Sequence, residues 1–134
     1  MILEKFFDRY PVFRYSPAFI NMAIIFNLSG TSGSNLPSFP IGIDKVFHMI
    51  AFAALGVSFA FWFKPPTWKI KPIKTVLLVI ALSTLFGISD EFHQYFVPGR
   101  NASIYDVIAD FLGASLAAVS YYFYVNFFSK KMAS

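Results

Sequence analysis

The sequence predicts an all-α integral membrane protein: a four-helix bundle with both termini in the cytoplasm and a polar cluster at its outer face. Three observations lead to this prediction. Of the 134 residues, 57% are hydrophobic and only 13% are charged, about half the charged share of an ordinary soluble domain. Four long apolar stretches are separated by polar or proline-containing segments. The basic residues flank alternate ends of these stretches, as membrane flanks do.

The first expected span covers residues 12–29, with Arg14 near its start and a loop rich in Ser, Gly and Pro at residues 29–40 after it. Before Pro11, apolar residues recur at helical spacing between charged ones, which indicates an amphipathic turn lying on the membrane. The alternative is that this segment is the frayed start of the first span. The apolar residues of the segment are Leu3, Phe6, Phe7 and Tyr10.

Three further spans are expected at residues 44–63, 73–95 and 103–129. Residues 46–63 contain one ionisable side chain, His48, and residues 111–129 contain none that is charged. Residues 75–89 would extend roughly 22 Å as a helix, which is short for a membrane core of about 30 Å. Asp90 and Glu91 should therefore lie at an interface, within the end of the third span. The whole chain, residues 1–134, is expected to be one transmembrane domain.

Orientation follows from the positions of lysine and arginine, because basic flanks stay on the cytoplasmic side. Four spans place nine of the eleven basic residues on one side and leave only Lys45 and Arg100 on the other. The second side receives five of the seven acidic residues. We therefore expect both termini to be cytoplasmic and the acidic helix ends to face outward.

In this topology the start of the second span, the end of the third and the start of the fourth meet in one leaflet. Ionisable side chains near hydrocarbon cost roughly 2.5–3.5 kcal/mol each at a helix centre, so they mark a candidate site. We expect the convergent residues to bind a polar ligand. They are Asp44, Lys45, His48, Asp90, Glu91, Gln94, Arg100, Ser103, Asp106 and Asp110.

Spacing supports this convergence. Asp44 and His48 are four residues apart and share one helix face. Pro98 and Gly99 predict a tight turn, after which Ser103 can cap the last helix. A stripe at helical spacing on that helix should face the interior, and it consists of Ser103, Asp106, Asp110, Gly113, Ala117 and Ser120. Small residues elsewhere in the spans, such as Gly56 and Gly87, are interpreted as helix-packing contacts.

Several of these residues have purely structural alternatives. Asp44 and Asp106 both lie where a carboxylate stabilises the start of a helix. His48 can be a hydrogen-bonded buried histidine without a further role. Asp110 lies about 6 Å deeper than Asp106 and needs a donor, such as Arg100, Lys45 or His48, or else a proton.

Composition also excludes some classes of function. The chain has no cysteine, which removes disulfides, thiolate nucleophiles and cysteine metal sites. Its net charge of +4 is spread between apolar stretches instead of forming one basic surface, so no nucleic-acid partner is expected. Neither a metalloprotease helix motif nor a nucleophile elbow is present. We expect no cofactor and no resident metal.

The polar motifs resemble those of the VanZ-like family of small bacterial membrane proteins. The resemblance covers roughly residues 27–120, including the loop that ends in Leu36-Pro37, and departs at Asp110, where the family more often has Asn. The matching residues are Asp44, Lys45, His48, Ala51, Phe52, Leu55, Gly56, Gly87, Asp90, Glu91, Gln94, Phe96, Pro98, Gly99, Arg100, Ser103, Asp106 and Gly113.

The resemblance implies a multi-pass protein of the bacterial cytoplasmic membrane, linked to resistance against teicoplanin-type glycopeptides. Its outward pocket would bind the head group of a lipid, a lipid-linked cell-wall precursor or a lipoglycopeptide, with Arg100 and Lys45 as cationic contacts. One alternative is a membrane-embedded hydrolase or transferase, with His48 and Asp44 as the candidate catalytic pair and the acids around Asp90 holding a divalent metal. Another is a small proton-coupled or lipid carrier.

Overall fold

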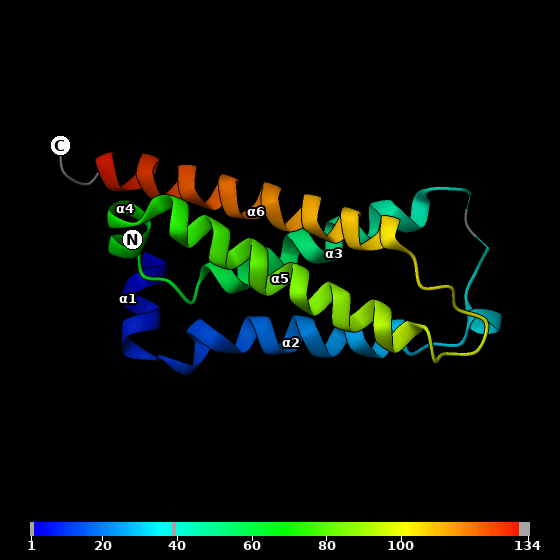
Figure 1. The fold of residues 1–134 in the computed structure, drawn as a ribbon. Helices are drawn as coiled ribbons and strands as arrows, with labels where there is room; N and C mark the ends of the chain where they lie inside the picture. The colour runs from blue at the N-terminus through cyan, green and yellow to red at the C-terminus, as the bar shows by residue number, and fades with distance from the viewer. Residues whose placement is uncertain (1, 39, 132–134) are drawn as a thin grey trace.

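The computed structural model describes residues 2–38 and 40–131, the last four of these by their backbone only. The described residues form six α-helices and a 3₁₀ turn, η1 (Gly33–Asn35), and contain no strand. Four long helices lie alongside one another, and two short ones lie at one end (Figure 1). The long helices are α2 (Val12–Ser29), α3 (Ile43–Ala60), α5 (Pro72–Gln94) and α6 (Ile104–Lys131), and the short ones are α1 (Ile2–Arg9) and α4 (Pro65–Ile70). The all-α prediction is confirmed.

Three helices of the described chain are long and apolar enough to cross a membrane: Ile43–Ala60, Pro72–Gln94 and Ile104–Phe127. These three helices agree with the prediction of a membrane protein. α2 forms over the predicted range but is not one of the three, since Arg14, Asn21 and Asn27 lower its mean hydropathy. The crossing of α2 and the orientation of the chain stay predictions.

The start of the chain is helical, as its periodicity indicated, and α1 is attached to the longer helices by Phe7 and Arg14. The buried ring of Phe7 lies 5.4 Å from the ring of Phe61, which follows α3. The Arg14 guanidinium, also buried, donates to the Glu4 carboxylate at 2.6 Å and to the Phe61 carbonyl at 2.9 Å. Arg14 therefore joins α1, α2 and the end of α3, a role that its position as a basic flank did not predict.

The segment between the second and third expected spans contains a helix that was not predicted, α4. Pro65 occupies its first position, where a missing N–H costs nothing. Trp68 is fully buried and its indole N–H donates to the Phe63 carbonyl at 3.2 Å. At the same end Lys64 lies 3.0 Å from Asp8, and its hydrogen bond lowers the pKa of that exposed carboxyl below the usual value.

Glycine and alanine allow α3, α5 and α6 to approach closely. A Cβ on Gly113 would overlap the backbone carbonyl of Met49, so the backbones of α6 and α3 are in contact there. A Cβ on Gly56 would lie 3.0 Å from the Ala117 methyl group. On α5, a Cβ on Gly87 would lie 2.6 Å from the Asp110 carboxylate. The packing role predicted for these small residues is confirmed.

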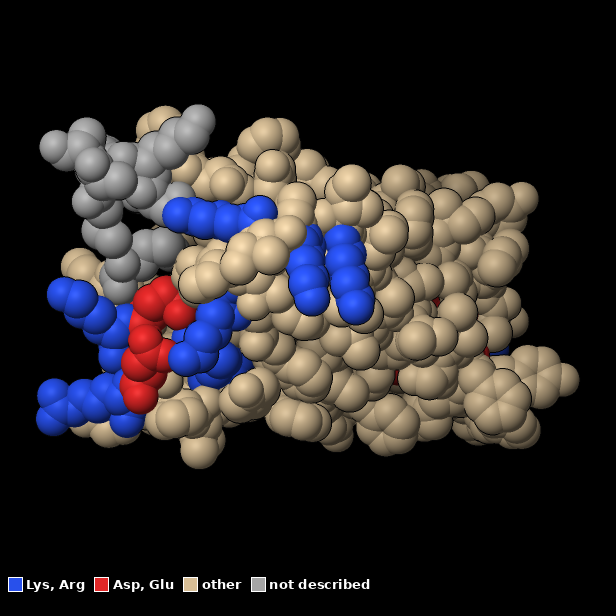
Figure 2. Space-filling model, turned by 60° about the vertical axis from the view of Figure 1, so that its left-hand side comes forward, with Lys and Arg blue, Asp and Glu red and all other residues tan. Residues whose placement is uncertain are grey.

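The two ends of the structure differ in charge. One end carries α1, α4 and the last turns of α6, and Figure 2 shows basic side chains gathered there while the remaining visible surface is almost uncharged. The other end, called here the polar end, consists of the last turns of α2 and α5, the first turns of α3 and α6, and the loops between them (Figure 1). Exposed lysines of the first end are Lys5, Lys64, Lys69, Lys71 and Lys74.

Candidate functional site

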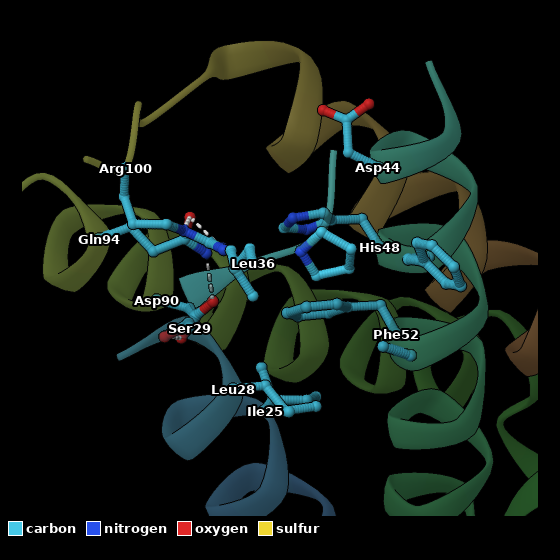
Figure 3. Close-up of a pocket in the computed structure, with 13 residues that line it drawn as sticks. Ile25, Leu28, Ser29, Leu36, Asp44, His48, Phe52, Asp90, Gln94 and Arg100 are labelled. Atoms are coloured by element: carbon cyan, nitrogen blue, oxygen red, sulfur yellow. Dashed lines mark hydrogen bonds between the residues drawn. The ribbon is translucent and has the colours of Figure 1, made fainter. Parts of the chain in front are cut away.

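A pocket of about 290 Å³ lies at the polar end, between α2, α3, α5 and two loops. In Figure 3, His48 and Phe52 of α3 lie across the pocket from Asp90, Gln94 and Arg100. One part of the wall is apolar and another part is polar. The apolar residues are Ile25, Leu28, Leu36, Pro37, Phe47, Ala51 and Phe52, and the polar ones are Ser29, Asp44, His48, Asp90, Gln94 and Arg100.

A chain of hydrogen bonds crosses one wall of the pocket. Arg100 donates from Nη2 to the Gln94 side-chain carbonyl at 2.9 Å, and the Gln94 amide donates to the Asp90 carboxylate at 3.1 Å. The other oxygen of Asp90 accepts from the Ser29 hydroxyl at 2.6 Å. Asp90 is only 2% exposed, and these two donors satisfy its carboxylate oxygens in place of water. Arg100 itself has no ion pair among the described side chains.

Local backbone geometry places Arg100 over Gln94. The Arg100 N–H donates to the Val97 carbonyl at 3.1 Å, closing a tight turn in which Gly99 has a φ of +73°. That turn packs against the loop after α2, where the Gly33 N–H donates to the Pro98 carbonyl at 3.1 Å. A Cβ on Gly33 would overlap the Gly99 carbonyl, so both positions need glycine. The contact holds Leu36 and Pro37 at the pocket.

A second polar group, called here the His48 cluster, lies where α3, α5 and α6 meet. His48 Nδ1 lies 2.9 Å from Asp110 Oδ1, and Asp110 is fully buried. Lys45 Nζ lies 2.6 Å from Asp106 Oδ1 and 2.6 Å from Asp44 Oδ2. Glu91, 6% exposed, accepts the Ser103 backbone N–H on Oε2 at 2.8 Å. The cluster consists of Lys45, His48, Glu91, Asp106 and Asp110.

Three members of the cluster have the composition of a metal site. One ligand atom each of His48, Glu91 and Asp106 lie within 4.8 Å of one another. Two buried carboxylate oxygens beside them, Glu91 Oε1 and Asp110 Oδ2, have no hydrogen-bond partner among the described residues. Buried polar atoms are normally paired, so these two oxygens call for an explanation.

The structure brings together all ten residues that sequence reasoning gathered at one end. Five of them line the pocket, and the other five are the four remaining members of the His48 cluster and their neighbour Ser103. Their roles toward a ligand stay predictions. The residues that line the pocket are Asp44, His48, Asp90, Gln94 and Arg100.

The structure also decides between the alternatives for the helix starts. Gly42, with a φ of +89°, occupies the N-cap position of α3, and Asp44 lies in the first turn, where a carboxylate suits the helix dipole. Ser103 does cap α6, since its hydroxyl accepts the Tyr105 N–H at 3.2 Å. Asp106 does not complete a capping box, because the Ser103 N–H donates to Glu91 instead.

Two sequence expectations differ from the structure. The alternative pairing of His48 with Asp44 differs from the structure, since the Asp44 carboxylate binds Lys45. The structure confirms His48 as the partner of Asp110, one of the three donors considered for it. The interior stripe of α6 continues from Ser103 to Ala117, but Ser120 is exposed. The helix turns by less than a full turn over three residues, so Tyr121 takes the buried position.

The family pattern already included four residues of the apolar wall, Leu36, Pro37, Ala51 and Phe52, but neither the part of the wall on α2 nor Ser29 was singled out. Ile25, Leu28 and Ser29 lie on α2 within an apolar stretch, where lipid-facing and pocket-facing residues look alike in a sequence. One signal was present: Ser29 ends the stretch, and a hydroxyl at a helix end near buried acids is a suitable donor.

Charge at the polar end is unbalanced. Five carboxylates face two fixed cations, Lys45 and Arg100, which leaves an excess of three negative charges if all five are ionised and His48 is neutral. In a low-dielectric surrounding such an excess is costly.

Comparison with known proteins agrees with the polar motifs. The sequence profile described as VanZ/LLP1 matches residues 4–126. The chain is similar to an uncharacterised protein of the fission yeast Schizosaccharomyces pombe, with 32% identity over 82 residues that cover 60% of this chain and 48% of the yeast protein. The chain thus matches about half the length of that relative. No solved structure matches.

Proposed function

Because the chain belongs to the VanZ/LLP1 family and its pocket joins an apolar wall to a polar one, we propose that it binds the polar head of a phosphorylated membrane lipid or lipid-linked precursor. The apolar wall, which includes Ile25, Leu28 and Phe52, would contact the first carbons of the lipid chain. The polar wall would contact the head group. We further propose that α2 crosses the membrane, that both termini are cytoplasmic, and that the pocket opens outward.

The observation that carries this proposal is the state of Arg100. Its guanidinium lines the pocket, and its only side-chain hydrogen bonds among the described residues go to the neutral amide oxygen of Gln94. A guanidinium without a carboxylate partner retains donors for a phosphate or carboxylate oxygen. Lys45 is less available for this role, since Asp44 and Asp106 both lie 2.6 Å from its ammonium.

The class of lipid follows from the range of the family. VanZ-type glycopeptide resistance favours a bacterial cell-wall precursor or a lipoglycopeptide as the ligand. The similar yeast protein favours a head group that is not confined to bacterial walls. A phosphorylated lipid satisfies both, and a phosphate fits the remaining donors of the Arg100 guanidinium, which has no carboxylate partner among the described residues.

Lipid retention tests the proposal. The purified protein is placed in nanodiscs of phosphatidylcholine containing phosphatidic acid, and the phosphatidic acid that stays bound is measured by native mass spectrometry. Arg100→Ala should retain phosphatidic acid with an affinity at least about tenfold lower. The reason is the loss of one charge-assisted contact worth roughly 1.5–3 kcal/mol. Lys74→Ala, which removes an exposed cation from the opposite end, is the matched control. Equal retention by Arg100→Ala and wild type at equal folding would refute the proposal.

A second candidate function, hydrolysis of the head group, is favoured by the His48 cluster. Binding a head group does not require an imidazole and several buried carboxylates beside the pocket. Such a cluster is more typical of a catalytic site. In this reaction a water oxygen attacks phosphorus, the bond from phosphorus to the leaving oxygen breaks, and the leaving oxygen takes a proton. Release of inorganic phosphate from phosphatidic acid by wild type, but not by His48→Ala, would establish it. Absence of release from the wild type would leave binding alone.

A further inference from the structure

The geometry points to a divalent-cation site formed by His48, Glu91 and Asp106 at the polar end. The bound ion would contact a phosphate oxygen of the lipid in the pocket. The role in lipid binding rests on the proposed function, whereas the cation site itself does not. The first support is convergence: three helices, α3, α5 and α6, each provide one ligand, with ligand atoms within 4.8 Å of one another. Such a spacing allows one ion to contact all three.

The second support is an unpartnered buried oxygen. Glu91 uses Oε2 to accept the Ser103 N–H, while its Oε1 has no partner among the described residues although the side chain is 6% exposed. A buried carboxylate oxygen without a donor destabilises the folded protein, because it has lost its water without gaining a partner. A bound cation at the cluster would satisfy this oxygen and remove that destabilisation.

The third support is the contact between His48 and Asp110. An imidazole whose Nδ1–H donates to a carboxylate presents the lone pair of Nε2 to a metal, and this arrangement is the usual one for metal-binding histidines. His48 Nδ1 lies 2.9 Å from the fully buried carboxylate of Asp110. Asp110 is thus a positioning residue. Its carboxylate occupies the space that is free because Gly87 has no Cβ.

Charge gives a fourth support. A phosphate would be repelled by the excess of carboxylates at the polar end unless a cation lies between them. With all five carboxylates ionised and His48 neutral, a divalent ion would remove most of the excess of three negative charges and leave coordination positions for water or a phosphate oxygen. One imidazole and two carboxylates suit Mn²⁺ or Zn²⁺ better than the all-oxygen sites of Ca²⁺.

Lys45 competes with this ion. Its ammonium lies 2.6 Å from Asp106 and is partly exposed, so its flexible side chain can withdraw toward Asp44 when a metal binds. This competition yields a test that a purely structural cluster would not pass. Replacing Lys45 by Met should strengthen metal binding, although it removes an ion pair.

The experiment measures Mn²⁺ binding to protein in detergent after removal of bound metal with EDTA, from the loss of the free-ion electron paramagnetic resonance signal. Glu91→Gln and Asp106→Asn should each weaken Mn²⁺ binding by more than about tenfold. Lys45→Met should tighten it several-fold, and Asp8→Asn, at the opposite end, should leave it unchanged. Circular dichroism confirms that each variant is folded.

The outcomes separate the two proposals. If folded wild type binds no Mn²⁺, or if Glu91→Gln and Lys45→Met both bind as wild type does, the cation site is refuted, while Arg100-dependent retention of phosphatidic acid can still stand. If Mn²⁺ binds as expected but phosphatidic acid is not retained with or without Mn²⁺, the proposed function fails and the cation site remains. Retention that requires Mn²⁺ and is lost in Glu91→Gln supports both.

Discussion

The imidazole of His48 on α3 contacts the carboxylate of Asp110 on α6, with Nδ1 2.9 Å from Oδ1, although 62 positions separate the two residues. The contact joins the two helices at the polar end and links the pocket, which His48 lines, to the fully buried carboxylate of Asp110. The same pair therefore joins α3 to α6 and orients the imidazole ring of His48.

The His48–Asp110 contact should appear as an energetic coupling. We expect the double-mutant cycle of His48→Ala and Asp110→Ala, measured as free energy of unfolding in mixed detergent, to give a coupling of about 0.5–3 kcal/mol. The cycle of His48→Ala with Asp44→Ala is the control and should give almost none, since Asp44 pairs with Lys45. A larger coupling to Asp44 than to Asp110 would contradict this assignment.

Gly87→Ala should lower stability and disturb the cluster. The added methyl group would lie 2.6 Å from Asp110 Oδ2 and 3.1 Å from a ring carbon of Phe52, both in tightly packed surroundings. Overpacking of this kind costs about 1–3 kcal/mol, seen as a lower Tm in detergent. Ser83→Ala, one turn earlier on the buried face of α5, should be nearly neutral because its hydroxyl has no partner among the described residues. Similar Tm values for the two variants would be the opposite of what we expect.

Gly33→Ala should impair the pocket more than the fold. Its Cβ would overlap the Gly99 carbonyl, so the loop carrying Leu36 must move away from the turn before Arg100. We expect retention of phosphatidic acid to fall several-fold while the helical circular dichroism spectrum is kept. Asn35→Ala, an exposed change in the same loop, serves as the comparison. Should retention fall equally in both variants, the glycine contact is not what positions the loop.

The orientation can be tested with single cysteines, because the chain contains none of its own. A cysteine replacing Asn101, exposed between α5 and α6, should react with a membrane-impermeant maleimide on intact cells. A cysteine replacing Lys69 on α4 should react only after permeabilisation. Lys5→Cys should behave like Lys69→Cys if α2 crosses the membrane. Labelling of Lys5→Cys on intact cells would show that α2 does not cross.

Sequence reasoning reached the helices and the convergence of the polar residues because both depend on strong local signals. Apolar stretches long enough to cross a membrane are expected to form helices. The four-residue spacing of Asp106 and Asp110 then places both on one face of α6. The Pro98-Gly99 pair and the Ser103 cap were likewise local, and the structure contains both.

Such reasoning could narrow the partnerships across helices but could not decide them: it left three possible donors for Asp110, of which the structure selects His48. Which carboxylate meets His48 depends on how far α6 is shifted along α3, and that shift is set by the contact of Gly113 with the Met49 backbone. The part of the apolar wall on α2 was missed for a similar reason, since nothing in the pattern of α2 distinguishes Ile25 from its lipid-facing neighbours. The short α4 was missed because its position depends on the burial of one residue, Trp68.

The contact between the backbones of α3 and α6 at Gly113 also limits how the protein can move. Two helices in backbone contact resist both sliding and rotation, so the polar side chains that they contribute to the polar end keep a nearly constant separation. A carrier must expose its cargo first to one compartment and then to the other, which would require this seam to open. The seam is better suited to a rigid receptor, whose selectivity is set by a preformed shape.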